Sequence, residues 1–146
     1  MTVDTKNFQD LTPNELYSLL QLRSEVFVVE QNCVYQDIDG KDRKALHVLG
    51  LEDDKIIAYT RIFKPGDYFT EASIGRVVVK KSLRGKGLAY KIMNASIDAV
   101  KEHFQETIIR VSAQTYLRDF YNNLKFKQVG EEYMEDGIPH IAMVRN

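Results

Sequence analysis

The sequence predicts a protein of the α/β (α+β) class, built on a mixed central sheet. Three observations lead to this prediction. Residues 74–79 are apolar and mostly β-branched, which is typical of a strand buried on both faces. A helical pattern over residues 88–103 separates this strand from a second apolar strand at residues 107–112, and such a crossover places the two strands parallel. Turn-separated strand pairs on either side predict antiparallel neighbours.

A helix is predicted in the first part of the chain. Thr12 can cap it, Pro13 suits its first turn and Glu15 completes a capping box. Apolar side chains then recur at helical spacing to about Val28. The polar stretch 30–44 is predicted to be a loop.

The remaining predicted elements are short. Residues 47–51 and 56–63 flank an acidic turn and indicate a hairpin. Residues 117–124 indicate a short helix that carries aromatic side chains. Residues 127–133 and 138–144, again separated by a turn, indicate a terminal hairpin.

Length and composition narrow the class of protein. A chain of 146 residues with 44% hydrophobic residues fits one globular domain, residues 1–146. Twenty Lys and Arg residues nearly balance 21 Asp and Glu residues, so no overall charge favours nucleic acid or an anionic membrane. Neither an export signal nor an apolar run of the roughly 20 residues that cross a bilayer is visible. A single cysteine, Cys33, provides neither a disulfide nor a zinc site. We therefore expect a cytoplasmic protein without a bound metal.

The most informative segment is the basic turn between the central strand and the helix at residue 88. Gly85 and Gly87 allow backbone N–H groups to approach a ligand closely. Free N–H groups at the start of a helix favour a phosphate. The turn is not a Walker loop, and Tyr90 stands where a dinucleotide fingerprint needs a third small residue. The segment predicts a phosphate-bearing ligand of another kind.

Residues 84–89 resemble the signature of the GCN5-related N-acetyltransferase (GNAT) family. That signature is Gln or Arg, two variable residues, Gly, one variable residue, and Gly or Ala, and each fixed position matches. A second family landmark, an Asn followed by a Tyr and a Phe, is similar to Gln114, Tyr121 and Phe126, with Gln in place of Asn. Residues 26–31, 35–40 and 135–140 extend the resemblance to the ElaA-like branch of the family.

The resemblance implies the GNAT fold, a mixed central sheet of about six to seven strands flanked by about four helices. It also implies acetyl-CoA as cosubstrate, with the pantetheine arm along the central strand and the pyrophosphate on the basic turn. The coenzyme-binding residues that it implies are Val77, Val78, Val79, Arg84, Gly85, Lys86, Gly87, Leu88, Ala89 and Gln114.

Catalytic roles are assigned partly from the resemblance and partly from chemistry. Tyr121 falls where many family members keep a tyrosine beside the coenzyme sulfur, so we expect it to protonate or hydrogen-bond the leaving sulfur. A backbone N–H near Val77–Val79 can stabilise developing charge on the carbonyl oxygen. Glu30, His47 and His140 are alternative general bases. Three arginines either line an acceptor cleft that selects a carboxylate or pair with acidic side chains: Arg23, Arg61 and Arg76.

The predicted function is direct transfer of an acetyl group from acetyl-CoA to a primary amine of a small molecule or peptide. An acceptor oxygen or a protein lysine differs from this only in the acceptor. The alternative is a non-catalytic acyl-CoA-binding regulatory module that acts through a protein partner. No nucleic-acid or membrane partner is expected, and the protein is expected to be a monomer or a homodimer.

Overall fold

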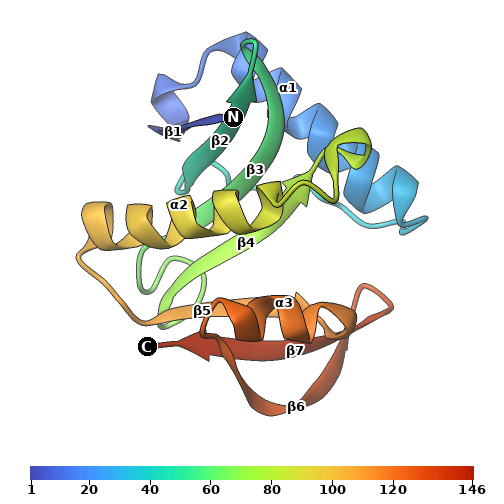
Figure 1. Cartoon of the computed structure of the whole chain (residues 1–146), viewed down its shortest axis with the longest axis vertical. Coiled ribbons are helices and arrows are strands. Elements are labelled where there is room, and N and C mark those ends of the chain that lie inside the picture. Colours follow the sequence, from blue (N-terminus) through green and yellow to red (C-terminus); the bar gives the residue numbers. More distant parts are fainter.

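All seven strands form one mixed sheet in the order β1-β2-β3-β4-β5-β7-β6 (Figure 1). The computed structural model describes residues 1–146. Every neighbouring pair is antiparallel except β4 and β5, which are parallel, as the predicted crossover requires. The strands are β1 Thr2–Asn7, β2 Leu46–Glu52, β3 Lys55–Phe63, β4 Ala72–Val79, β5 Ile109–Gln114, β6 Lys127–Glu135 and β7 Ile138–Arg145.

Three α-helices accompany the sheet: α1 Pro13–Arg23, α2 Leu88–Phe104 and α3 Arg118–Asn123. The predicted capping box is present, because Thr12 and Glu15 exchange side-chain and backbone hydrogen bonds. A π-helical segment, η2 (Ser24–Glu30), continues directly from α1. The resemblance implied about four helices, which is slightly more than the three α-helices present. None of the helices combines the length and the apolar character needed to cross a bilayer.

Strand β1 was not predicted from the sequence. It is polar and lies at the edge of the sheet, where it pairs with β2 from Thr2↔Leu51 to Asn7↔Leu46. Strand β6, at the other edge, is exposed at all its residues. Strand β1 carries no apolar run, so its pairing partner rather than its own sequence defines it, whereas β6 was predicted as part of the terminal hairpin.

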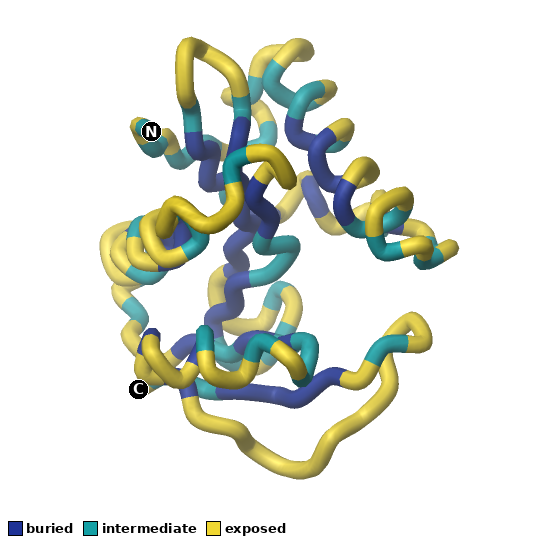
Figure 2. The backbone as a smooth tube through the Cα atoms, turned by 45° about the vertical axis from the view of Figure 1, so that its right-hand side comes forward, coloured by how far each residue is buried: buried dark blue, intermediate teal, exposed yellow.

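Helices α2 and α3 cover one face of the sheet, and α1 with η2 covers the other (Figure 2). The larger apolar core lies between the sheet and the helices α2 and α3, and it includes Ile92, Val100, Val111, Phe126 and Ile141. A smaller core lies under α1 and η2 and contains Leu19, Leu22, Val26, Leu49, Tyr59 and Val78. The two cores fix β4 from both sides at the point where the chain enters the basic turn.

Strands β4 and β5 diverge soon after they meet (Figure 1). Their pairing is limited to Ala72↔Ile109 and Ser73↔Arg110. Beyond this point the β5 side of β4 has no strand partner. The expectation that β4 is buried on both faces was therefore wrong in its middle, where Gly75, Arg76 and Val77 are half-buried.

A β-bulge lies in this open part of β4. Between the pairs Arg61↔Gly75 and Tyr59↔Val78, β4 has one residue more than β3. Arg76, inside the bulge, has a φ of 50°, which a non-glycine residue rarely adopts. Bulges often lie beside active sites, where they redirect backbone and side-chain groups.

Candidate functional site

A cavity of about 510 Å³ lies in the opening between β4 and β5. Strand β4 lines it from Ile74 to Val79, and Ser112 and Gln114 line it from β5. The other walls come from η2 with the following loop, from the start of α3, and from the β6–β7 turn. The basic turn and the predicted catalytic residues Glu30, Tyr121 and His140 therefore meet at one cavity.

The basic turn has the backbone conformation that its glycines predict. Gly85 and Gly87 have φ values of 82° and 78°, and α2 begins directly after Gly87. No side chain caps this helix, so its first N–H groups are free for a ligand. Of the six predicted residues of the turn, Arg84 and Ala89 line the cavity. The predicted strand residues Val77, Val78 and Val79 line it as well.

Arg84 connects the basic turn to η2. Its guanidinium donates two hydrogen bonds to the Glu30 carboxylate, at 2.5 and 2.9 Å, and a third to the Val79 carbonyl at 3.1 Å. The hydrogen bond from Arg84 lowers the pKa of Glu30. Glu30 therefore stays ionised and is a poorer proton acceptor than an ordinary carboxylate.

Tyr121 lies at the wall formed by α3 and is 5% exposed. Its ring packs edge-on against Phe120 and Phe126, with centroid separations of 5.1 and 5.8 Å. Burial raises the pKa of the Tyr121 hydroxyl above its usual value. The phenol therefore keeps its proton at neutral pH and can act as a hydrogen-bond donor, although the raised pKa makes it a weaker acid than an exposed tyrosine.

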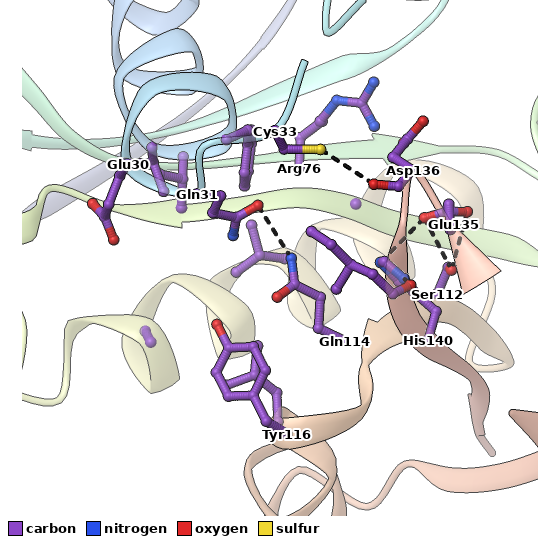
Figure 3. A pocket seen from close by; sticks show the side chains of 18 of the residues that line it. Glu30, Gln31, Cys33, Arg76, Ser112, Gln114, Tyr116, Glu135, Asp136 and His140 are labelled. Carbon is purple, nitrogen blue, oxygen red and sulfur yellow. Dashed lines mark hydrogen bonds and ion pairs between the residues drawn. The ribbon is translucent and has the colours of Figure 1, made fainter. Parts of the chain in front are cut away.

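His140 also lines the cavity, from β7, and is 7% exposed. Its Nδ1 is 2.7 Å from the Ile138 carbonyl oxygen. A carbonyl only accepts hydrogen bonds, so Nδ1 carries a proton, and in the neutral tautomer the lone pair lies on Nε2. Nε2 is 3.3 Å from a carboxylate oxygen of Glu135, which can pair with the ring once Nε2 is protonated (Figure 3).

Two contacts bridge the walls of the cavity. Gln114, a predicted coenzyme-binding residue, donates to the side-chain oxygen of Gln31 at 3.4 Å, and the two side chains meet from opposite walls (Figure 3). The Cys33 thiol is 3.3 Å from the Asp136 carbonyl oxygen. Sequence reasoning singled out Gln31 only as part of the polar segment 30–31 and did not single out Asp136, because these contacts join distant parts of the chain.

The structure places His47 outside the cavity. It is fully buried, with Nδ1 2.7 Å from the Tyr59 hydroxyl and Nε2 2.9 Å from the Asp42 carbonyl oxygen. Burial lowers the pKa of His47. Both ring nitrogens are occupied within the protein, so this histidine has a structural role.

The three arginines pair with three aspartates of the loop after η2. Arg23 binds Asp37 and Asp42, both within 2.9 Å. The other pairs are Arg61 with Asp39 and Asp42, and Arg76 with Asp37 and Asp39. These guanidinium groups are therefore neutralised by partners within the protein, which favours the pairing alternative over selection of a substrate carboxylate.

This ion-pair network holds residues 37–42 against the sheet. Partial burial alone would raise the pKa of Asp39, but hydrogen bonds from Arg61 and from the Lys41 N–H lower it to about 2. Asp42 also has a lowered pKa, because its hydrogen bonds with Arg23 and Arg61 outweigh its burial. Both aspartates are ionised at neutral pH.

Comparison with known proteins agrees with this geometry. A family model described as an acetyltransferase (GNAT) domain matches residues 8–146. Protein ElaA of Escherichia coli (strain K12) is 44% identical over 138 residues, which cover 93% of this chain and 90% of that protein. The crystal structure of Escherichia coli ElaA superposes with a TM-score of 0.92 at 41% identity and 99% coverage of both chains. An acyl-CoA N-acyltransferase from Pseudomonas aeruginosa superposes with a TM-score of 0.93 at 40% identity, covering 100% of both chains.

A mixed sheet that opens between two parallel strands, beside a basic helix N-terminus, defines an acyltransferase fold. The chain belongs to the GNAT acetyltransferase family, in its ElaA-like branch. The expected fold and the family resemblance are confirmed, and the protein is an acyltransferase that draws on coenzyme A-linked acyl groups.

Proposed function

We propose that this enzyme transfers an acetyl group from acetyl-CoA directly to a primary amine of a small molecule or peptide. One observation carries the proposal: a single cavity reaches from the basic turn to both Tyr121 and His140. Acetyl-CoA bound at the basic turn and an amine that enters from the side of His140 would meet beside the bulge of β4. Direct transfer needs both substrates in one site at the same time.

The residues around the cavity fit coenzyme A. On the side that faces β5, the backbone groups of β4 have no strand partner after Ser73, so they are free to bind an extended, amide-containing arm. The free N–H groups after Gly87 suit a pyrophosphate. Bound acetyl-CoA supplies the acyl group as a thioester. Open N–H groups of β4 near Val77 can hold the acyl carbonyl oxygen and stabilise negative charge there.

We assign the acid to Tyr121. Its buried hydroxyl remains protonated at neutral pH and can donate to a departing thiolate. The edge-on aromatic contacts with Phe120 and Phe126 pack the ring and help to hold the hydroxyl in place. A fixed hydroxyl position matters because proton transfer requires hydrogen-bond distance to the sulfur.

We assign the base to His140 rather than to Glu30. An alkylamine has a pKa of about 10.4, so it must lose a proton before it can attack. The neutral His140 ring offers the lone pair of Nε2, and Glu135 can stabilise the ring after it takes the proton. Glu30 is held by Arg84 and has a lowered pKa, so we propose that it positions Arg84.

The alternative, a regulatory acyl-CoA-binding module, is less well supported. A pure binding module needs neither a buried phenol nor an oriented histidine at the cavity. We also propose that the whole chain forms one catalytic domain, that it works in the cytoplasm as a monomer or homodimer, and that it needs no metal, nucleic acid or membrane.

The proposal predicts that His140→Gln lowers the turnover number by roughly 100-fold, the usual size of a general-base contribution. Purified protein is incubated with acetyl-CoA and a panel of primary amines, while free thiol and acetylated product are measured. The matched control is His103→Gln, which removes an exposed histidine on α2 and leaves turnover unchanged. Full activity of His140→Gln would remove the assigned base, and absence of any acetylated amine would contradict the function.

A further inference from the structure

A second, smaller cavity of about 60 Å³ adjoins the first. The two share lining residues on β4 and on the facing strands, namely Ile74, Gly75, Arg76, Ser112 and Glu135. The smaller cavity extends toward the start of β4, where three aromatic side chains also line it, Phe63, Tyr68 and Phe69. Its volume admits a small polar group or a few water molecules.

Two residues that line this cavity each carry a buried polar atom without a hydrogen-bond partner. The atoms are Nε of Arg61 and Oγ of Ser73, whose residues are 1% and 2% exposed. The large majority of buried side-chain polar atoms in proteins are hydrogen-bonded, so two such atoms on residues of one cavity indicate a missing partner.

The chemistry of these atoms defines the partner. The Arg61 Nε–H is only a donor, and the Ser73 hydroxyl can donate as well. The remaining nitrogens of Arg61 already bind Asp39 and Asp42. A group that fits both free donors therefore carries an oxygen that accepts hydrogen bonds.

The charges around the cavity favour a neutral oxygen. Arg61 and Arg76 are each neutralised by loop aspartates. Glu135 also faces this cavity and is not paired with an arginine. A substrate carboxylate would meet the Glu135 charge without an unneutralised cation to offset it, whereas an amide carbonyl would not.

The distance along β4 between Ser73 and the bulge sets the length of an acceptor that reaches both. Ser73 precedes Arg76, in the bulge, by three residues, so the two are roughly 10 Å apart along the strand. An acceptor whose amine reacts at the bulge would place its carbonyl at this distance. A chain of about five to seven methylene groups spans that length.

Resting on the proposed function, we infer that the smaller cavity is an acceptor subsite that binds an amide carbonyl roughly 10 Å from the reacting amine. Arg61 Nε–H and the Ser73 hydroxyl donate to the carbonyl oxygen. The subsite selects amino amides over amino carboxylates and plain alkylamines of equal length.

The test measures binding independently of acyl transfer. ω-Amino amides with two to eight methylene groups are titrated by calorimetry into the protein, with and without saturating coenzyme A. ω-Amino carboxylates and alkylamines of the same lengths form the comparison series. We expect the amides to bind roughly threefold to tenfold more tightly than either series, with an optimum near five to seven methylene groups.

Two variants test whether the preference for amides arises at the smaller cavity. Ser73→Ala removes one free donor with little change in volume, and we expect it to abolish the advantage of the amides. It removes an unpaired buried hydroxyl, so the melting temperature is expected to stay the same or rise. The matched control is Thr115→Val, because Oγ1 of Thr115 is also buried without a partner but lines neither cavity. Thr115→Val keeps the advantage of the amides.

The outcomes separate this inference from the proposed function. Four results would each overturn the subsite. Three concern the wild type: equal binding of the three series, tightest binding of the carboxylates, or no detectable binding of any amide. The fourth is full amide selectivity in Ser73→Ala. Acetylation of alkylamines with no amide preference overturns the subsite alone. Selective amide binding without acetylation of any amine supports the subsite and contradicts the proposed function.

Discussion

Arg76 joins a local backbone distortion to the surrounding loop. Its φ of 50° costs on the order of 1–2 kcal/mol for a residue with a Cβ atom. The side chain offsets this cost, because its guanidinium donates to Asp37 at 2.7 Å and lies 5.7 Å from the centre of the Tyr35 ring. The β-bulge beside the cavity is therefore held by contacts with the loop after η2.

Tyr121 is the residue whose role can be tested most cleanly. Tyr121→Phe keeps the ring and its contacts with Phe120 and Phe126 but removes the hydroxyl. We expect the turnover number to fall by roughly 100-fold, with little change in affinity for acetyl-CoA, because only the proton donor is lost. Steady-state kinetics and a binding titration measure the two effects.

The control for this substitution is Tyr17→Phe, which alters an exposed tyrosine on α1. It is expected to leave both quantities unchanged. Unaltered turnover of Tyr121→Phe would show that the phenol takes no part in the reaction.

At the scale of elements, the loop over residues 37–42 is fixed by charge rather than by apolar packing. Its three aspartates, Asp37, Asp39 and Asp42, face three arginines from α1, β3 and β4. Removing one partner from such a buried network is costly, because it leaves the opposite charge uncompensated. The network also makes the stability of the protein depend on pH.

The pKa of Asp39, lowered to about 2 from an ordinary value of 3.8, sets the direction of this dependence. The unfolded chain binds a proton at Asp39 more readily than the folded protein does, so acid favours unfolding. The stabilisation from Asp39 is complete above about pH 5 and is lost as the pH falls toward 2. Urea unfolding measured between these pH values checks this expectation.

In Asp39→Asn we expect lower stability at pH 7 and a shallower loss of unfolding free energy in acid. The control variant is Asp98→Asn, at an exposed position on α2, which is expected to keep the wild-type profile at both ends of the pH range. An identical acid profile for Asp39→Asn and the wild type would show that the ionised Asp39 does not stabilise the fold.

At the scale of the whole molecule, local signals in the sequence predicted the centre of the fold. The apolar strand, the glycine turn and the amphipathic helix each have a pattern within a few residues, and all three are present as β4, the turn at Gly85 and Gly87, and α2. The crossover rule then gave the parallel pair β4 and β5.

Long-range features were beyond such reasoning. The ion pairs of Arg23 and Arg76 with Asp37 join residues that are 14 and 39 positions apart in the chain. The bulge at Arg76 arises from pairing with β3, and no residue type marks it in the sequence. For the same reason the sequence suggested His47 as a base, although its burial beside Tyr59 excludes it from the cavity.

The most direct test of the account is a calorimetric titration of acetyl-CoA into the wild type, Gly87→Glu and Gly66→Glu. Both glycines have a positive φ and open space around the Cβ position, so the two substitutions impose similar strain and the same added charge. Gly66 lies in the connection between β3 and β4 and lines neither cavity. We predict binding to the wild type and Gly66→Glu, and at least tenfold weaker binding to Gly87→Glu, because its carboxylate repels the pyrophosphate at the start of α2. Equal binding to all three proteins, or no binding to the wild type, would contradict the placement of coenzyme A on this turn.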